Sequence, residues 1–312
     1  MLRSALIVTL CGVFGVALTA QQVADRTYTP VTLTPAFAEA KGPTVLVDEA
    51  HQNAMTVDDR LAAFAKLARS DGFRLTVNRQ PFTLAALATA DILMISNARA
   101  EASAGPRDSA FSSTEVEAVR AWVHEGGALL LIADHMPLAS AAAKLAEAFG
   151  VHFSDAFTME PFLFELDPDA AVEASYQHPT IFRRQDGTLR SHPITRGRTT
   201  AEQVNQVATF TGQAFSGEGL EPLLVMPSGF VSVFPSAPWV FRATDRRQAA
   251  EGLVQGAVKR VGAGRAAFFG EAAMFTAQVW GPARVPMGIN HPLATGNAQF
   301  ALNVLRWLAG VE

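Results

Sequence analysis

Segments with the composition of strands alternate with amphipathic segments between residues 43 and 150. The strand-like segments lie at 44–47, 73–78, 90–98 and 128–134, and most of them are continuously apolar. Strands with apolar residues on both faces are typical of a parallel sheet that is covered on both sides. The pattern therefore predicts a parallel α/β sheet in this part of the chain.

The segments between these strands carry apolar residues at helical intervals. One of them follows Thr56 and Asp59, and another follows Ser112 and Glu115. Both pairs have the spacing of a capping box, in which each side chain bonds the backbone N–H of the other residue at a helix start. We therefore expect a helix after each pair. Further helices are predicted over 138–149 and 293–308.

The pattern changes between residues 151 and 250. Aromatic residues, prolines and short alternating runs such as GFVSVF at 229–234 predict antiparallel strands and long loops. GRAAFFGEAAMF at 264–275 then returns to the pattern of a buried strand. We expect a single domain over 43–312, with a β-rich insertion at about 151–250.

The first 42 residues have the pattern of a leader and a linker. Arg3 precedes the almost wholly apolar segment 5–18, and Ala20 is a suitable cleavage point, so we predict a signal peptide over 1–20. Residues 21–42 are polar and contain proline, as linkers often do. An uncleaved membrane anchor is the alternative. The expected location is the periplasm or the medium, without stable membrane insertion after cleavage.

Composition excludes several classes of protein. Hydrophobic residues make up 49% of the chain and charged residues 17%, which argues against a disordered chain. There are 25 basic and 29 acidic residues, a net charge of −4, and no basic run, so nucleic acid is not an expected partner. The only cysteine, Cys11, lies in the predicted signal peptide. The mature chain would then have no disulfide and no cysteine nucleophile.

Polar side chains follow several of the predicted strands directly. In open parallel sheets, ligands bind beyond the carboxyl ends of the strands, where loops and helix starts converge. We therefore predict one pocket at this edge of the sheet. The predicted ligand-binding residues are Asp48, Glu49, His51 and Asn97, and the predicted catalytic residues are Asp134, His135 and Glu271.

Two chemistries fit such a pocket. In the first, His51, His135 and Asp48 bind a divalent metal such as zinc, which lowers the pKa of a bound water. In the second, no metal is present, an acid–histidine pair is the general base, and the helix that follows offers amide donors to an anion. A structural interpretation also exists for each residue, because Asp134 and Glu271 can both bond the start of a helix. A pocket that binds a ligand without chemistry is the third possibility.

The chain resembles an uncharacterised exported bacterial branch of the class I glutamine amidotransferase-like superfamily, near the trehalose-utilisation-like proteins. The similar segments are VLVDEAHQN, GGALLLIADHMP, SHPITRG, GRAAFFGEAAMFTAQ and NAQFALNVLRWL, within about residues 43–310. The resemblance implies a flavodoxin-like three-layer α/β/α fold with a mainly parallel sheet. Catalytic members carry a cysteine in the turn after a central strand, where this chain has Asp134 and His135. We therefore expect no amidotransferase activity, but a site at that turn.

Together these features predict an exported domain that binds or hydrolyses a small polar molecule, such as a sugar. The alternative is a non-catalytic binding or interaction module of the cell envelope. Fold analogy alone does not decide between them, because one fold hosts many functions.

Overall fold

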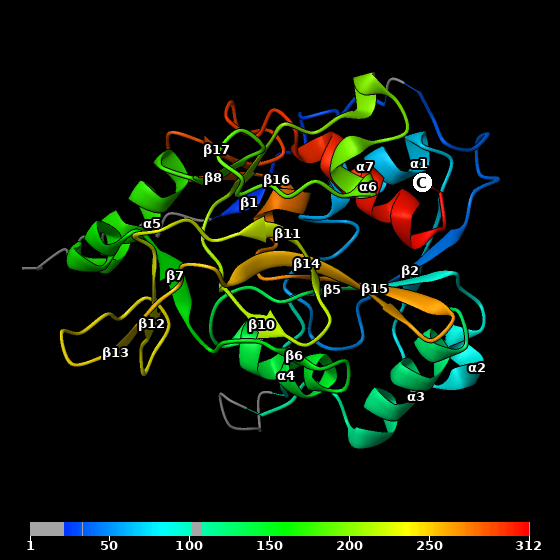
Figure 1. Ribbon diagram of the computed structural model, residues 1–312, viewed down its shortest axis with the longest axis horizontal. Helices are drawn as coiled ribbons and strands as arrows, with labels where there is room; N and C mark the ends of the chain where they lie inside the picture. The colour runs from blue at the N-terminus through cyan, green and yellow to red at the C-terminus, as the bar shows by residue number, and fades with distance from the viewer. Residues whose placement is uncertain (1–21, 33, 102–107, 312) are drawn as a thin grey trace, which may run out of the picture.

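A seven-stranded sheet runs through the centre of the computed structural model (Figure 1). The structure describes residues 22–32, 34–101 and 108–311, so the predicted signal peptide at 1–20 lies outside the described residues. The strands are β2 (Thr44–Asp48), β3 (Arg74–Asn78), β4 (Ile92–Ser96), β5 (Ala128–Ile132), β11 (Glu221–Val225), β14 (Val254–Val261) and β15 (Gly264–Phe269). Their order across the sheet is β11-β14-β15-β5-β4-β2-β3.

Most neighbours in this sheet are parallel. The strands β3, β2, β4, β5 and β15 pair in parallel, whereas β14 pairs antiparallel with both β15 and β11. Every residue of β2, β4 and β5 is buried, while the edge strand β3 alternates between exposed and half-buried positions. The predicted mainly parallel α/β sheet is therefore confirmed. The carboxyl ends of its five parallel strands place the five chain segments that follow them along one edge of the sheet.

Helices pack on both faces of this sheet (Figure 1). They are α1 (Ala62–Ser70), α2 (Leu84–Leu87), α3 (Ser113–His124), α4 (Leu138–Glu147) and α7 (Asn297–Leu308). Because successive strand residues point to opposite faces, β2 contributes Val45 and Val47 to the core under α1 and α7, and Leu46 to the core under α3 and α4. The two resulting cores hold the strand ends rigidly.

One of the two predicted capping boxes exists. The hydroxyl of Ser112 accepts a bond from the backbone N–H of Glu115, whose carboxylate accepts from the backbone N–H of Ser112. The box predicted at Thr56 and Asp59 is wrong. The Asp59 N–H donates to the Thr56 carbonyl in a turn, and α1 begins only at Ala62.

Residues 151–250 contain short antiparallel strands, as predicted, but also helices. The strands are β6 (Val151–His152), β7 (Phe157–Met159), β8 (Thr180–Arg183), β9 (Gln206–Thr209), β10 (Ser216–Gly217), β12 (Val231–Phe234) and β13 (Arg246–Ala249). The helical segments are η1 (Pro161–Glu165), α5 (Pro168–Gln177), α6 (Pro193–Arg196) and η2 (Thr200–Glu202). The region also supplies β11 to the central sheet.

A small sheet joins the two ends of the described chain. Its strands are β1 (Val23–Ala24), β16 (Ala277–Trp280) and β17 (Val285–Gly288), in the order β1-β16-β17. The short helix η3 (Ala273–Phe275) lies between β15 and β16. The segment predicted as a linker thus contributes a strand that pairs antiparallel with β16.

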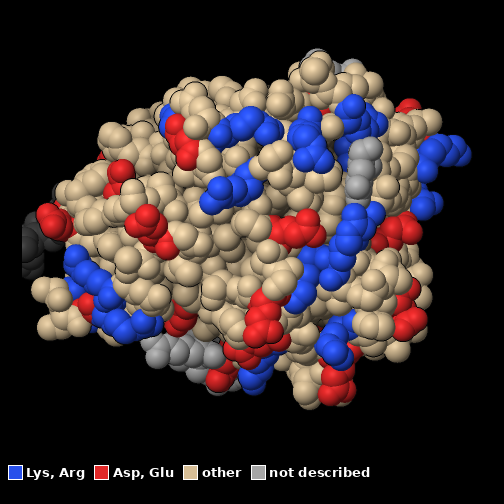
Figure 2. Space-filling view, viewed as in Figure 1, with Lys and Arg blue, Asp and Glu red and all other residues tan. Residues whose placement is uncertain are grey.

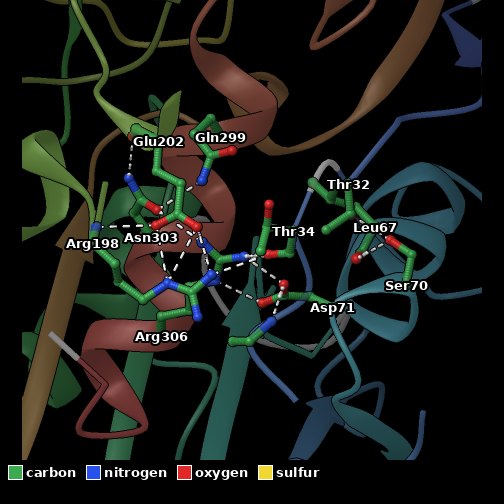
Figure 3. A network of polar contacts seen from close by, with 11 residues as sticks. Thr32, Thr34, Leu67, Ser70, Asp71, Arg198, Glu202, Gln299, Asn303 and Arg306 are labelled. Carbon is green, nitrogen blue, oxygen red and sulfur yellow. Dashed lines mark hydrogen bonds and ion pairs between the residues drawn. The ribbon is translucent and has the colours of Figure 1, made fainter. Parts of the chain in front are cut away.

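A buried ion-pair network fixes α7 to the rest of the fold (Figure 3). Arg306 of α7 donates from Nε to Asp71, with 2.8 Å between Nε and Oδ2, and its Nη1 lies 3.0 Å from Glu202 Oε1. Arg198 also bonds Glu202, and this bond is the main cause that lowers the pKa of Glu202 to about 2. Asp71 follows α1 and Glu202 ends η2, so the network connects three distant segments.

The surface carries both signs of charge. On the face shown in Figure 2, Lys and Arg side chains alternate with Asp and Glu side chains. Within the described ranges, no helix combines the length and the apolarity that crossing a membrane requires.

Candidate functional site

A cavity of about 160 Å³ lies beyond the carboxyl ends of the parallel strands. Four of the seven predicted site residues line it. Asn97 follows β4, Asp134 and His135 follow β5, and Glu271 follows β15. The loop after β2 contributes Ala54 and Met55 instead of the acids and histidine that were expected there. The structure therefore brings together residues from segments that are far apart in the sequence.

Glu271 is completely buried at the wall of this cavity. Its Oε1 accepts a hydrogen bond from the backbone N–H of Ala273 at 2.7 Å, and its Oε2 accepts from that of Met274 at 2.8 Å. Burial and, next, the charge of Asp134 raise the pKa of Glu271, and these two causes outweigh the backbone donors that oppose them. The carboxyl group can therefore hold a proton where an exposed glutamate would have lost it.

Asp134 is held by backbone groups and by Asn97. Its Oδ1 accepts from the backbone N–H of His135 at 2.9 Å, and its own backbone N–H donates to Asn97 Oδ1 at 2.9 Å. Asn97 has a φ of 51°, a left-handed conformation that asparagine adopts more readily than most residues. This link fixes the turn after β5 to the turn after β4.

The imidazole of His135 has one nitrogen hydrogen-bonded and one without a hydrogen-bond partner among the described residues. Nδ1 lies 2.8 Å from the carbonyl oxygen of Met136. Because a carbonyl only accepts, Nδ1 must carry the hydrogen, and Nε2 of the neutral ring then has a free lone pair. The ring stacks on Phe157, with 4.0 Å between centroids, and meets Trp239 edge-on at 5.2 Å. The predicted acid–imidazole pair is not formed here, because Asp134 bonds the backbone of His135 and not its ring.

Four further side chains of the cavity are cationic or aromatic. They are Arg60, Arg99, Tyr176 and Trp239. Burial and the charge of Asp134 raise the pKa of Tyr176, so its phenol is a neutral hydrogen-bond donor. Arg99 stands two residues after Asn97, so the strand-end pattern reaches it. The other three come from a helix start, from α5 and from the connection between β12 and β13, where no strand-end signal exists.

An acid–imidazole group does form elsewhere, apart from the cavity lining. His51 Nδ1 lies 2.9 Å from Asp48 Oδ2, and His51 Nε2 lies 2.9 Å from Glu115 Oε1. Phe82 and Phe111 cover the imidazole, each with its ring centroid 4.7 Å away. We call His51, Asp48 and Glu115 the closed cluster. Its members pair with one another, and Asp48 and His51 are not among the residues that line the cavity.

The closed cluster is held by charge. Burial by itself lowers the pKa of His51, but the hydrogen bonds and charges of Asp48 and Glu115 outweigh it and raise the value. Burial likewise opposes ionisation of Glu115, yet the bonds from Ser112, His51 and Phe82 lower the pKa of Glu115 to about 2. The cluster is therefore most stable with a charged imidazole between two carboxylates.

The remaining predictions concern Glu49 and a metal. Glu49 accepts from the backbone N–H of Val57 and pairs with Arg79 at 3.0 Å, so it does not line the cavity. The predicted metal ligands His51, His135 and Asp48 are not brought together, since both nitrogens of His51 are already bonded to carboxylates. Among the described residues, no group of three or more His, Cys, Asp or Glu side chains could hold a metal ion.

Comparisons of this chain with known proteins find similar solved structures but no matching family model or curated protein. The N-terminal domain of mmIFT52 is 16% identical with a TM-score of 0.55, over 85% of this chain and 96% of that one. The likeness is one of fold.

Other solved structures align over most of their length at lower TM-scores. A cytoplasmic protein of Salmonella typhimurium LT2 is 13% identical with a TM-score of 0.46, over 85% of this chain and 98% of that one. A ThuA-like protein of Bacteroides uniformis is 12% identical with a TM-score of 0.44, over 88% of this chain and 95% of that one. ThuA-like proteins are among the solved structures that align with this chain.

Proposed function

We propose that the protein hydrolyses a small polar, carbohydrate-type ligand by general acid–base catalysis without a metal. One observation carries the proposal. A buried carboxyl group with a raised pKa and an imidazole with a free nitrogen line the same cavity. Hydrolysis of a glycosidic bond needs such an acid and such a base, and strongly perturbed groups in a cavity are candidates for these roles.

In this proposal Asp134, His135 and Glu271 each have a distinct role. Nε2 of His135 takes a proton from the attacking water as its oxygen bonds the reacting carbon. The carboxyl group of Glu271 gives its proton to the departing oxygen as the old bond to that carbon breaks. Asp134 supports this chemistry, because its charge adds to the effect of burial, which is the larger cause of the raised pKa of Glu271. His135 gains one proton and Glu271 loses one. Proton exchange with water then returns both groups to their starting states.

The cavity favours a small ligand. Its volume of about 160 Å³ lies below the roughly 300–1,000 Å³ of most ligand pockets. A single sugar unit, or the end of a longer molecule, suits this space better than an internal stretch of a polymer. Trp239 supplies an apolar wall, and Asn97, Tyr176 and Thr211 supply polar groups for hydroxyls.

A non-catalytic binding module is the second candidate. The backbone N–H groups of Ala273 and Met274 bond both oxygens of Glu271, so the carboxyl group also fixes the turn before η3. A glutamate retained only for this turn would leave a pocket that binds without turnover. The same cavity residues would then serve recognition alone.

We also propose a flavodoxin-like three-layer arrangement and export of the chain. The five parallel strands run in the order β3-β2-β4-β5-β15, which in chain order is the 2-1-3-4-5 pattern of flavodoxin-like sheets. Helices on both faces of the sheet support the same interpretation. Export rests on the apolar segment after Arg3, which is typical of a signal peptide.

The test is turnover of p-nitrophenyl α- and β-glycosides, followed by release of p-nitrophenol. We expect the wild-type protein to release it, and His135→Asn and Glu271→Gln each to lose about 10²- to 10⁴-fold in rate. Unfolding by urea must show that both variants are folded, because glutamine keeps only one of the two acceptor oxygens of Glu271. Binding of free sugars without turnover by the wild-type protein would favour the binding module. Equal rates in the variants would overturn the assigned roles.

A further inference from the structure

Two arginines of the cavity have side-chain donors without a hydrogen-bond partner among the described residues. Arg60 donates from Nη2 to the carbonyl oxygen of Gln22 at 3.1 Å, but its buried Nε has no hydrogen-bond partner among the described residues. Asp59 Oδ2 lies 3.9 Å from this Nε, beyond hydrogen-bond distance. A buried donor without a partner is costly, so the guanidinium of Arg60 is incompletely satisfied by the described residues.

The guanidinium of Arg99 has fewer partners than that of Arg60 among the described residues. Its backbone N–H donates to the carbonyl oxygen of His51, but its side chain makes no hydrogen bond or ion pair within the described part of the chain. Arg99 is exposed, so its side chain stands where the cavity meets solvent. A second cation is thus available to a group that enters from outside.

The positive charge of Arg60 affects another residue of the cavity lining. This charge favours ionisation of the Tyr176 phenol, another side chain of the same wall, although burial and the acids outweigh it. The described ion pairs do not join Arg60 or Arg99 to Asp134 or Glu271. The arginines are therefore not neutralised by the carboxyl groups that they share the cavity with.

Charge balance indicates the ligand that fits. When Glu271 holds its proton, the cavity lining carries two arginine charges and one carboxylate, Asp134, and so has one excess positive charge; Asp59, which lies 3.9 Å from Arg60 Nε, is outside the lining. The chain as a whole is acidic, with a net charge of −4. A monoanion balances the lining, whereas a phosphate dianion would leave an excess negative charge beside Asp134. Guanidinium groups bind carboxylates through paired hydrogen bonds.

We propose that the ligand of this cavity is a small hydroxylated monocarboxylate, of the sugar-acid type, whose carboxylate binds Arg60 and Arg99. The proposal rests on the proposed function for its site but concerns recognition only. It names the chemical class of the substrate, which the acid–base residues leave open.

The test is calorimetric binding of matched acids and neutral molecules to the full chain. D-glucuronate, D-galacturonate and D-lactate are compared with D-glucose, D-galactose and 1,2-propanediol, and inorganic phosphate is the dianion probe. We expect at least one acid to bind about tenfold or more tightly than its neutral partner and than phosphate. Arg99→Gln should remove most of this preference, and Arg60→Gln/Arg99→Gln should remove all of it.

Controls separate recognition from folding and from catalysis. Arg120→Gln, on the exposed surface of α3 and outside the cavity, should keep the preference. Arg99→Gln guards against misfolding, because the Arg99 side chain makes no hydrogen bond or ion pair with the described residues, whereas Arg60 also donates to Gln22. Equal binding of acids and neutral partners, binding of none of the acids, or preference for phosphate would overturn the proposal. Loss of turnover in the Glu271→Gln variant tests the catalytic proposal separately.

Discussion

Two groups of the same residue types differ in how their members are paired. The closed cluster and the cavity each contain one histidine and two acidic residues. In the closed cluster, both nitrogens of the His51 ring lie 2.9 Å from carboxylate oxygens. In the cavity, the ring of His135 bonds only a carbonyl oxygen, and the carboxyl groups bond backbone N–H groups. The first arrangement pairs its charged groups with one another, whereas the second leaves Nε2 of His135 without a partner among the described residues.

The difference follows from what surrounds each histidine. Phe82 and Phe111 enclose the ring of His51, so its charge persists only with the two acids beside it. Phe157 and Trp239 pack against the ring of His135 from two sides, while its Nε2 remains available. A histidine near an acid is thus a stronger indication of a functional site when its second nitrogen is unpaired than when both nitrogens are bonded.

Removal of His51 should produce the largest loss of stability. His51→Ala leaves Asp48 and Glu115 as buried carboxylates without their shared cation, and breaking a buried ion pair in this way typically costs about 3–5 kcal/mol. Urea unfolding at pH 6 measures the change in free energy of unfolding. A loss below about 1 kcal/mol would show that the cluster is not a structural unit, and the comparison with the cavity would fail.

The pH dependence of stability should show the closed cluster directly. Glu115 has its pKa lowered from 4.5 to about 2, so its contribution is present above pH 4.5 and is lost as pH falls towards 2. His51 has a raised pKa, so its contribution is present below about 6.5 and is lost as pH rises through the folded value. The cluster should therefore stabilise the fold most between pH 4.5 and 6.5.

Glu115→Gln is the variant that isolates this effect. Between pH 5.5 and 2.5, the wild-type protein should lose up to about 3 kcal/mol more of its unfolding free energy than the variant does. Glu202, whose pKa is also about 2, belongs to the separate network of Figure 3 and cancels in this difference. Parallel acid profiles of the two proteins would contradict the assignment.

The sequence indicates the sheet better than the site, for a physical reason. Buried parallel strands are apolar on both faces, so they stand out as runs such as ALLLI in β5. The residues that follow these strands share one edge, which explains why Asn97, Asp134 and Glu271 lie together. Strand ends do not, however, fix the direction of a side chain. The turn after β2 directs His51 to Glu115, 64 positions further along the chain.

Other parts of the cavity have no local signal in the sequence. Tyr176 belongs to α5, and Trp239 lies in the connection after β12, so both depend on how residues 151–250 pack against the sheet. Arg60 precedes a helix whose start was predicted several residues too early. Such residues become site residues only through tertiary contacts, which spacing along the chain does not encode.

Asp134→Asn should raise the free energy of unfolding moderately, whereas His51→Ala should lower it. Glu271 has a raised pKa, so its contribution to stability is present below its unfolded value and is lost as pH rises through the folded value. The change removes one cause of that rise, and relief of such a conflict at a functional site typically gains about 0.5–2 kcal/mol. Urea unfolding should show a larger gain at pH 8 than at pH 5. In the Glu271→Gln background the gain should vanish; a gain that persists there would mean that the two carboxyl groups do not interact.

His135→Ala should have the smallest effect on stability and so sharpens the contrast with His51. The change removes ring contacts with Phe157 and Trp239 but leaves no buried charge unpaired, so we expect a loss of at most about 1 kcal/mol. Urea unfolding of both alanine variants under one condition gives the comparison, because the chemical change is identical. If His135→Ala cost as much as His51→Ala, the cavity histidine would be structural too, and its free nitrogen would no longer indicate a site.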